Sequence, residues 1–178
     1  MKLSDDYVKK KIMFNIEEDV YFITYHLIII LIAFQCKQSE RYLKDYNKLA
    51  LLITISEKKQ YKEVIRKVLE NKCLEAADKQ RIFEIYYNSS LKKRSIRGII
   101  FTLDSKGIIQ LRKNRKTIDI TLDSSNVASL YSENILFKED IEFYKYIGER
   151  VSRVTIISLE TMEERILGDI RGTEWQIY

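Results

Sequence analysis

Apolar residues recur at helical spacing through the first 97 residues of the chain, which contain neither proline nor glycine. Such a stretch predicts long helices joined by short polar turns. The most apolar segment, Val20 to Phe34, favours a helix that is buried nearly all round. Its β-branched residues would also suit a strand. A membrane anchor ranks third, because the segment is shorter than the roughly 20 residues that a bilayer-spanning helix needs and includes His26.

Three more helices are expected before residue 91. The first covers residues 39–56, with Ser39 as its N-cap and these apolar residues at helical spacing: Tyr42, Leu43, Tyr46, Leu49 and Ile53. The second covers residues 58–74, where one face carries Val64, Ile65, Val68 and Leu69. The third covers residues 75–87, and the polar run at residues 88–90 predicts a turn that ends it.

A fourth helix, residues 91–107, leads directly into two short alternating segments. Its apolar residues gather on one side: Leu91, Ile96, Ile99, Ile100 and Leu103. Gly107 stands where a helix C′ residue adopts the left-handed conformation. The sequences IIQLR and TIDITL then alternate as strands do, and KNRK makes the turn between them. In the second strand, one face carries Ile118, Ile120 and Leu122 and the other carries Thr117, Asp119 and Thr121.

The tail predicts three closing helices, the last of which continues or restarts the one before: residues 126–137, 138–157 and 158–170. A narrow apolar stripe along this tail needs a cover. Packing onto the N-terminal helices and docking onto another subunit are equally compatible with the pattern.

The order helix, turn, helix, glycine and hairpin is typical of a winged helix-turn-helix. The expected fold is therefore mainly α with a small β-hairpin: a winged helix-turn-helix core flanked by N- and C-terminal helices. Residues 1–75 would form the N-terminal helical region, residues 76–123 the winged-helix unit with its hairpin wing, and residues 124–178 the C-terminal helical region.

The formal net charge of +5 hides an uneven distribution of basic residues. Between Leu91 and Lys116 there are nine basic residues and one acidic residue, Asp104. Eight of them are candidates for binding nucleic acid or an acidic partner: Lys92, Lys93, Arg94, Arg97, Arg112, Lys113, Arg115 and Lys116. The alternative is a solvated helix face and hairpin without a partner.

A winged helix places the opening turns of its recognition helix in the major groove and its wing along the backbone. Arg94 and Arg97 would then reach base edges or phosphates. Lys92 and Lys93 would contact phosphates, and the hairpin cations would straddle the backbone. Because the cluster has few side chains that discriminate bases, the contact is expected to be electrostatic and weakly sequence-specific.

Candidate catalytic residues are scarce. His26 is the one histidine, and inside the most apolar segment a core role suits it better than a catalytic one. Cys36 and Cys73 lie far apart, which predicts neither a disulfide nor a zinc site. The chain has no phosphate-binding glycine motif and no acidic spacing of a metal-dependent nuclease. We therefore expect no enzyme, no cofactor and no metal, and the absence of a signal peptide favours a cytoplasmic protein.

The order of segments resembles a known family. An apolar N-terminal helix leads into ALLITIS, a helical middle leads into RSIRGIIFTLDSKGIIQLR and KTIDITLDSSN, and a helical tail contains YIGERVSRVTIISLETMEERIL. This layout resembles the small middle component of bacterial ABC-three-component systems, the group that includes the Lamassu anti-phage systems. The resemblance covers most of the chain, and LDSKGIIQL followed by IDITLDSS is its best motif. It implies a non-catalytic adaptor between an SMC-like coiled-coil ATPase and an effector subunit, often a nuclease.

Two functions of different classes follow. The favoured one is a non-catalytic winged-helix adaptor subunit of an SMC-like ATPase defence complex, which bridges the ATPase and the effector. Its basic patch would hold double-stranded DNA by the backbone without sequence specificity, and no membrane partner is expected. The alternative is a stand-alone winged-helix transcriptional regulator that binds operators as a homodimer. A nuclease or toxin without recognisable motifs ranks third.

Overall fold

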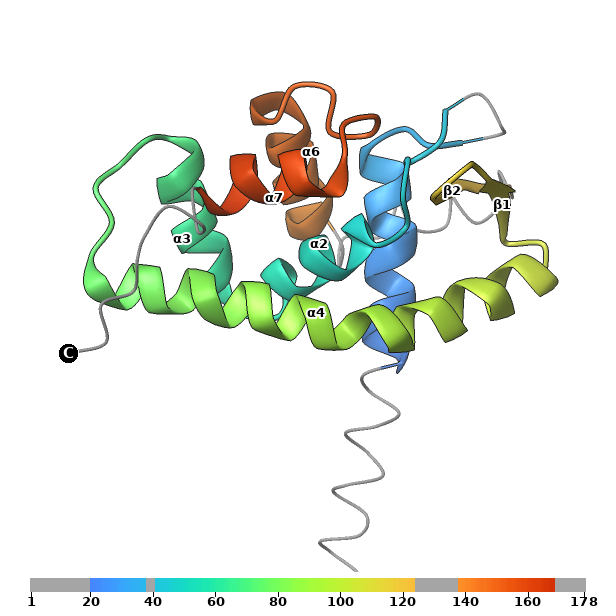
Figure 1. Ribbon diagram of the computed structural model, residues 1–178, viewed down its shortest axis with the longest axis horizontal. Coiled ribbons are helices and arrows are strands. Elements are labelled where there is room, and N and C mark those ends of the chain that lie inside the picture. The colour runs from blue at the N-terminus through green and yellow to red at the C-terminus, as the bar shows by residue number, and fades with distance from the viewer. Residues whose placement is uncertain (1–19, 38–40, 124–137, 169–178) are drawn as a thin grey trace, which may run out of the picture.

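Six helices and one two-stranded antiparallel hairpin make up the part of the chain that the computed structural model describes, residues 20–37, 41–123 and 138–168 (Figure 1). The elements are an N-terminal helix over residues 20–33, α2 (Lys48–Ser56), α3 (Lys59–Leu69), α4 (Ala76–Ser105), β1 (Ile109–Lys113), β2 (Ile118–Leu122), α6 (Lys138–Arg150) and α7 (Leu159–Leu167). This confirms the predicted mainly helical fold with a small hairpin. The helix expected at residues 126–137 and the N-cap expected at Ser39 lie outside the described residues.

The core is built around α2, in which all nine residues are buried. α4 runs beneath α2 and α3 along the lower edge of the view, and α7 packs against both α2 and α3 (Figure 1). Residues 26–34 are also buried without exception, which confirms the predicted burial for the second part of the N-terminal helix, whereas Val20, Tyr21 and Tyr25 in its first part are exposed. Each fully buried Leu or Ile side chain contributes about 1.5–3 kcal/mol, so these two helices supply much of the stability.

The helix expected to begin at Ser39 begins only at Lys48, which corrects the sequence-based prediction. Leu43 instead forms an antiparallel bridge with Ile120, exchanging backbone hydrogen bonds of 2.8 and 3.0 Å. Tyr46 N donates a further bond of 2.9 Å to the carbonyl of Ile118. The backbone groups before Lys48 are thus satisfied by β2, a partner far along the chain that local apolar spacing does not reveal.

The turn expected at residues 88–90 is absent, because α4 is one continuous helix of 30 residues. The hydroxyls of Ser89 and Ser90 both donate to the carbonyl of Tyr86, at 2.8 and 3.1 Å, so that their polar groups are satisfied inside the helix. Ser89 is buried and continues the apolar face of the helix as a small residue. The helix-turn-helix predicted between residues 76 and 107 is therefore wrong, and the helix that enters the hairpin is about 45 Å long.

The end of α4 follows the sequence-based prediction closely. Gly107 has φ +65° and lies in the left-handed region. Its N–H donates to the carbonyl of Asp104 at 2.9 Å, and the N–H of Ile108 donates to the carbonyl of Leu103 at 3.0 Å. These are the two hydrogen bonds of a Schellman motif, which reverses the chain direction and aims it into β1.

β2 is the inner strand of the hairpin. It pairs antiparallel with β1, with Arg112 opposite Asp119, and its other edge is bridged to Lys37 and Leu43. As predicted, Ile120 and Leu122 join the core. Asp119 and Thr121 of the opposite face are buried too.

The C-terminal helices pack onto the rest of the molecule. α6 ends at Arg150, and α7 restarts after a connection, with the Ser158 side chain accepting from Thr161 N as N-cap. Because α7 packs on α2 and α3, the apolar stripe of the described tail is covered within the chain. Among the described residues, no helix has the length and apolar character needed to cross a membrane.

Candidate functional site

The tip of the hairpin presents three of the predicted cations to solvent. Lys113, Arg115 and Lys116 are exposed, and within residues 20–37, 41–123 and 138–168 none of them forms an ion pair. The turn that carries them is closed by Asn114, whose N–H donates to the carbonyl of Thr117 at 2.8 Å. Asn114 Oδ1 also accepts from the backbone N–H of Arg115 at 2.9 Å. The cations therefore stand on an ordered turn.

Arg112 is held differently from the tip cations. Its guanidinium carbon lies over the ring of Tyr42, 3.9 Å from the ring centroid, and its Nη2 donates to Asp119 Oδ2 at 3.4 Å. Tyr42 is fixed in turn, because its hydroxyl donates to Gln110 at 2.8 Å. The Arg112 side chain is still 58% exposed to solvent.

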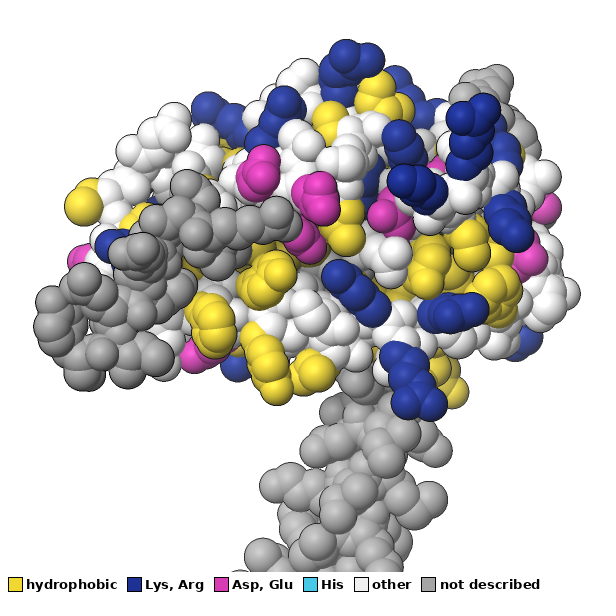
Figure 2. Space-filling model, in the orientation of Figure 1, with side chains coloured by type: hydrophobic (Ala, Val, Ile, Leu, Met, Phe, Trp, Pro, Cys, Tyr) yellow, Lys and Arg dark blue, Asp and Glu magenta, His cyan; other side chains and the backbone are white. Residues whose placement is uncertain are grey.

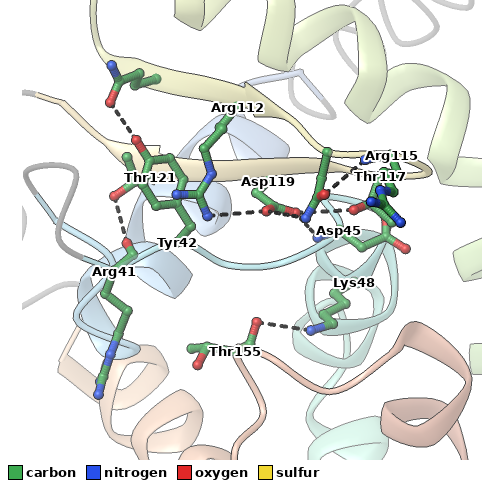
Figure 3. Close-up of polar contacts among 12 residues, drawn as sticks. Arg41, Tyr42, Asp45, Lys48, Arg112, Arg115, Thr117, Asp119, Thr121 and Thr155 are labelled. Carbon is green, nitrogen blue, oxygen red and sulfur yellow. Dashed lines mark hydrogen bonds and ion pairs between the residues drawn. The ribbon is translucent and has the colours of Figure 1, made fainter.

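Asp119 is the centre of this polar layer (Figure 3). Its carboxylate is buried and accepts from Asp45 N and Thr117 Oγ1, each at 3.2 Å, as well as from the longer contacts of Arg112 and Asn114. A buried carboxylate needs such donors, because its desolvation is otherwise costly. Asp119 thus links the hairpin and its turn to the backbone of Asp45.

The basic residues of α4 lie mid-helix rather than in opening turns. Lys92 is half-buried and forms an ion pair of 2.6 Å with Glu57, which fastens α4 to the end of α2. Lys93 is half-buried, whereas Arg94 and Arg97 are exposed. About 12 Å of helix separates Arg97 from the end of α4. Of the four predicted cations on α4, only the two arginines are presented freely to solvent.

Figure 2 shows Lys and Arg side chains along the top and over the right half of this face, where hydrophobic side chains lie among them. Hydrophobic side chains also follow the first half of α4, where Tyr86, Tyr87 and Leu91 are exposed. One helix therefore carries an apolar outer surface and then a basic one.

The structure adds three cations that the sequence did not single out. Arg41 and Lys44 come from the segment before α2, and Arg153 comes from the connection between α6 and α7. All three are exposed, and they make no ion pair among the described residues. The sequence placed each of them inside a helix, and it carries no local signal that they would meet at the hairpin.

These cations surround a hollow of about 460 Å³, called here the hairpin groove, which is lined among others by Arg41, Tyr42, Lys44, Arg112, Asp119 and Arg153. A hollow of about 590 Å³ adjoins it, sharing Arg41 and Arg153 and adding Lys145. A third of about 330 Å³ shares Lys44 and adds Arg115 and Lys116. Across the three hollows, seven cations face three carboxylates.

A buried lysine supports the wall of the groove. Lys48 is completely buried, and its ammonium donates to the carbonyls of Val154 at 3.0 Å and Thr155 at 3.2 Å (Figure 3). The Thr155 carbonyl also accepts from Lys44 N at 2.8 Å. Burial lowers the pKa of Lys48 to about 8, against the opposing influence of Asp45. The connection that carries Arg153 is thus anchored to α2.

The remaining buried titratable groups belong to the core. His26 Nδ1 lies 2.9 Å from the hydroxyl of Tyr144, which accepts from Ser56 at 2.6 Å. Burial lowers the pKa of His26 to about 4 and raises the pKa of Cys36 to about 12. Both groups are neutral at pH 7, which suits the core role predicted for His26. Within the described residues, no three His, Cys, Asp or Glu side chains are grouped to hold a metal.

Comparisons with protein-family models, with curated proteins and with solved structures give no match to this chain.

Proposed function

We propose that the chain is a non-catalytic, cytoplasmic adaptor subunit of an SMC-like ATPase complex that contacts the backbone of double-stranded DNA. The observation that carries this proposal is the set of exposed cations at the hairpin tip and at Arg94 and Arg97 of α4, which make no ion pair among the described residues. Such a surface attracts phosphates without reading bases.

A winged-helix arrangement is part of the same proposal, but its helices differ from those that the sequence suggested. The hairpin would be the wing, and α4 would be the helix that precedes it. A helix-turn-helix would then pair α3 with α4 across residues 70–75, rather than two halves of α4 across residues 88–90. DNA would meet the middle of α4 from the side, because Arg94 and Arg97 lie far from its N-terminus.

The adaptor role is supported by the outer face of α4. Tyr86, Tyr87 and Leu91 are exposed by 37, 57 and 61%, a surface of the kind that a helical partner covers. In the proposed complex the partners are the coiled-coil ATPase and an effector subunit, as in the Lamassu anti-phage systems that the sequence resembles. Defence against phage would be the task of the whole complex, with its chemistry in the other subunits.

The proposal predicts two separable properties of the full chain. Purified with an affinity tag from its own cells under nuclease treatment, it should bring down a coiled-coil ATPase and an effector. Binding of a labelled duplex, followed by fluorescence anisotropy, should be of similar strength for unrelated sequences. The variant K113E/R115E/K116E should weaken duplex binding by roughly tenfold or more and leave the partners attached.

Lys79 and Lys138 provide a control, because both are exposed cations outside the basic surface. The variant K79E/K138E should bind duplex nearly as the unchanged chain does. The alternative function, a stand-alone regulator, would be shown by a homodimer without partners that binds one operator with nanomolar affinity. That result would overturn the adaptor proposal.

A further inference from the structure

We propose that the hairpin groove binds a single strand of nucleic acid, with its phosphates on Arg41, Lys44 and Arg153 and a base on Arg112. This site differs from the convex surface of the hairpin tip and α4. It is connected with the proposed DNA contact only because the tip cations Arg115 and Lys116 line a hollow that adjoins the groove.

Charge is the first argument for this ligand. Three sides of the groove contribute a cation: the segment before α2, β1 and the α6–α7 connection. Arg41, Lys44 and Arg153 have no carboxylate partner among residues 20–37, 41–123 and 138–168, and the one carboxylate of the groove itself, Asp119, is engaged by four donors. Convergent cations without partners favour an anion, and arginine forks match phosphate oxygens.

Stacking distinguishes a nucleic acid from an acidic peptide. The Arg112 guanidinium lies over the Tyr42 ring and contacts Asp119, while its side chain is 58% exposed. We infer that a nucleobase continues this stack from the solvent side, as bases do on arginine planes and aromatic rings. A glutamate or aspartate side chain would make no use of such a planar surface.

The backbone around the groove is held in an unusual conformation. Arg153 has φ +61° and Asp45 has φ +63°, both in the left-handed region. For an arginine this region is sterically unfavourable, and residues held in it concentrate at ligand-binding sites. The anchor that fixes the Arg153 connection is the buried Lys48, through its bonds to Val154 and Thr155.

The shape of the surface favours a single strand over a duplex. The cations stand around a hollow, and the two adjoining hollows extend it past Lys145 at one end and past Arg115 and Lys116 at the other. A duplex presents its phosphates on a convex cylinder and suits the protruding hairpin tip. A single strand can bend into the hollow, because its backbone is flexible and its bases are free to stack.

The test measures binding of the full chain to a fluorescein-labelled oligothymidylate of about 12 nucleotides, within the usual site sizes. The variant R41E/R153E should weaken binding by roughly tenfold or more, and R41Q/R153Q should weaken it less. If the three cations each contact one phosphate, the slope of log affinity against log salt should be about −2, and each neutralised cation should reduce its magnitude by about 0.7. K79E/K138E, with the same change of net charge, should bind as the unchanged chain does.

The variant R112K tests the stacking role of Arg112, because it keeps the positive charge and removes the planar guanidinium. It should weaken oligothymidylate binding severalfold with an unchanged salt slope. Equal binding by R112K and the unchanged chain would overturn the role of Arg112 as a stacking surface.

Two competitors decide the class of ligand. A polyglutamate that displaces the oligonucleotide as well as unlabelled oligothymidylate does would overturn the nucleic-acid assignment.

Equal weakening of duplex and single-strand binding by R41E/R153E would overturn the preference for a single strand. If K113E and R94E/R97E weaken duplex binding while R41E/R153E leaves oligothymidylate binding unchanged, the groove inference fails and the proposed duplex contact stands. The reverse pattern supports the groove and removes the proposed DNA contact.

Discussion

Lys48 illustrates how one residue holds two distant parts of the chain together. Its ammonium is completely buried and is bonded to two backbone carbonyls rather than to a carboxylate. Carbonyl dipoles replace only part of the lost hydration, which is why burial lowers the pKa of Lys48 to about 8. The charged form is retained at pH 7 at a cost in stability, and in return the connection that carries Arg153 is fixed.

The depressed pKa of Lys48 predicts a specific dependence of stability on pH. Between pH 8 and the ordinary lysine pKa of 10.5, the unfolded chain keeps a proton that the folded chain has released. Stability should therefore rise with pH from about 8, by at most about 1.4 kcal/mol per pH unit. Urea unfolding at pH 7 to 9 measures it, and the variant K48M should lose this rise.

The pH range in which stability rises through Lys48 ends near pH 9 because of Cys36. Burial raises the pKa of the Cys36 thiol from 9.0 to about 12, so above pH 9 the unfolded chain releases that proton first, and this loss of stability offsets the gain from Lys48. A wild-type chain whose stability between pH 8 and 9 follows that of K48M would contradict the assigned role of the lysine.

At the scale of elements, α4 separates what the sequence can predict from what it cannot. The glycine stop, the alternation of β1 and β2 and the tip cations are local features, and the structure contains all of them. The continuity through residues 88–90 is not local, because Ser89 and Lys92 are accommodated by the core and by Glu57. Tertiary contacts there override the turn propensity of a polar triplet.

The Schellman motif at the end of α4 predicts that G107A destabilises the protein, and G98A is a control for which we expect stabilisation. At Gly107 an added Cβ meets nothing within 4 Å, so G107A should cost only the strain of φ +65°, about 1–2 kcal/mol. Gly98 also has open space around it and lies mid-helix, so G98A should stabilise the protein by about 0.5–1 kcal/mol. Thermal unfolding of both variants measures the difference, and destabilisation by G98A would contradict the continuous helix.

At the scale of the whole molecule, a buried polar network connects three helices. Tyr144 of α6 is bonded to His26 of the N-terminal helix and to Ser56 of α2, and its hydroxyl also donates to the carbonyl of Leu52. Burial raises the pKa of Tyr144 and lowers that of His26, so both stay uncharged in the folded state. The network fixes how the two ends of the described chain meet.

The same network predicts sensitivity to acid. Because the pKa of His26 is about 4 in the folded state and about 6.5 in the unfolded state, the unfolded chain binds the proton first as pH falls. Stability should decline from pH 6.5 toward 4, by at most about 1.4 kcal/mol per pH unit, and H26Q should show a flatter profile. Guanidinium unfolding at pH 7, 6 and 5 measures this, and equal slopes for both chains would exclude His26 as the source.

The candidate site also has one part that the local sequence predicts and one part that it does not. The sequence predicted the tip cations because they are consecutive, whereas Arg41, Lys44 and Arg153 meet them only through long-range pairing. Their local sequence had suggested helices; instead the pairing of Leu43 with Ile120 positions Arg41 and Lys44, and the bonds of Lys48 to Val154 and Thr155 position Arg153. A site assembled from three separated segments leaves no motif in any one of them.

That pairing also has a consequence for synthesis of the chain. Residues such as Asp45 and Asp119, which are 74 positions apart, meet only after α2, α3 and α4 have been made. Contacts of such long range form late in folding, because the intervening chain must first be ordered. A nascent chain that stops before β2 therefore lacks the hairpin groove entirely, and because Arg153 also lines the groove, binding there is confined to molecules whose translation has passed the α6–α7 connection.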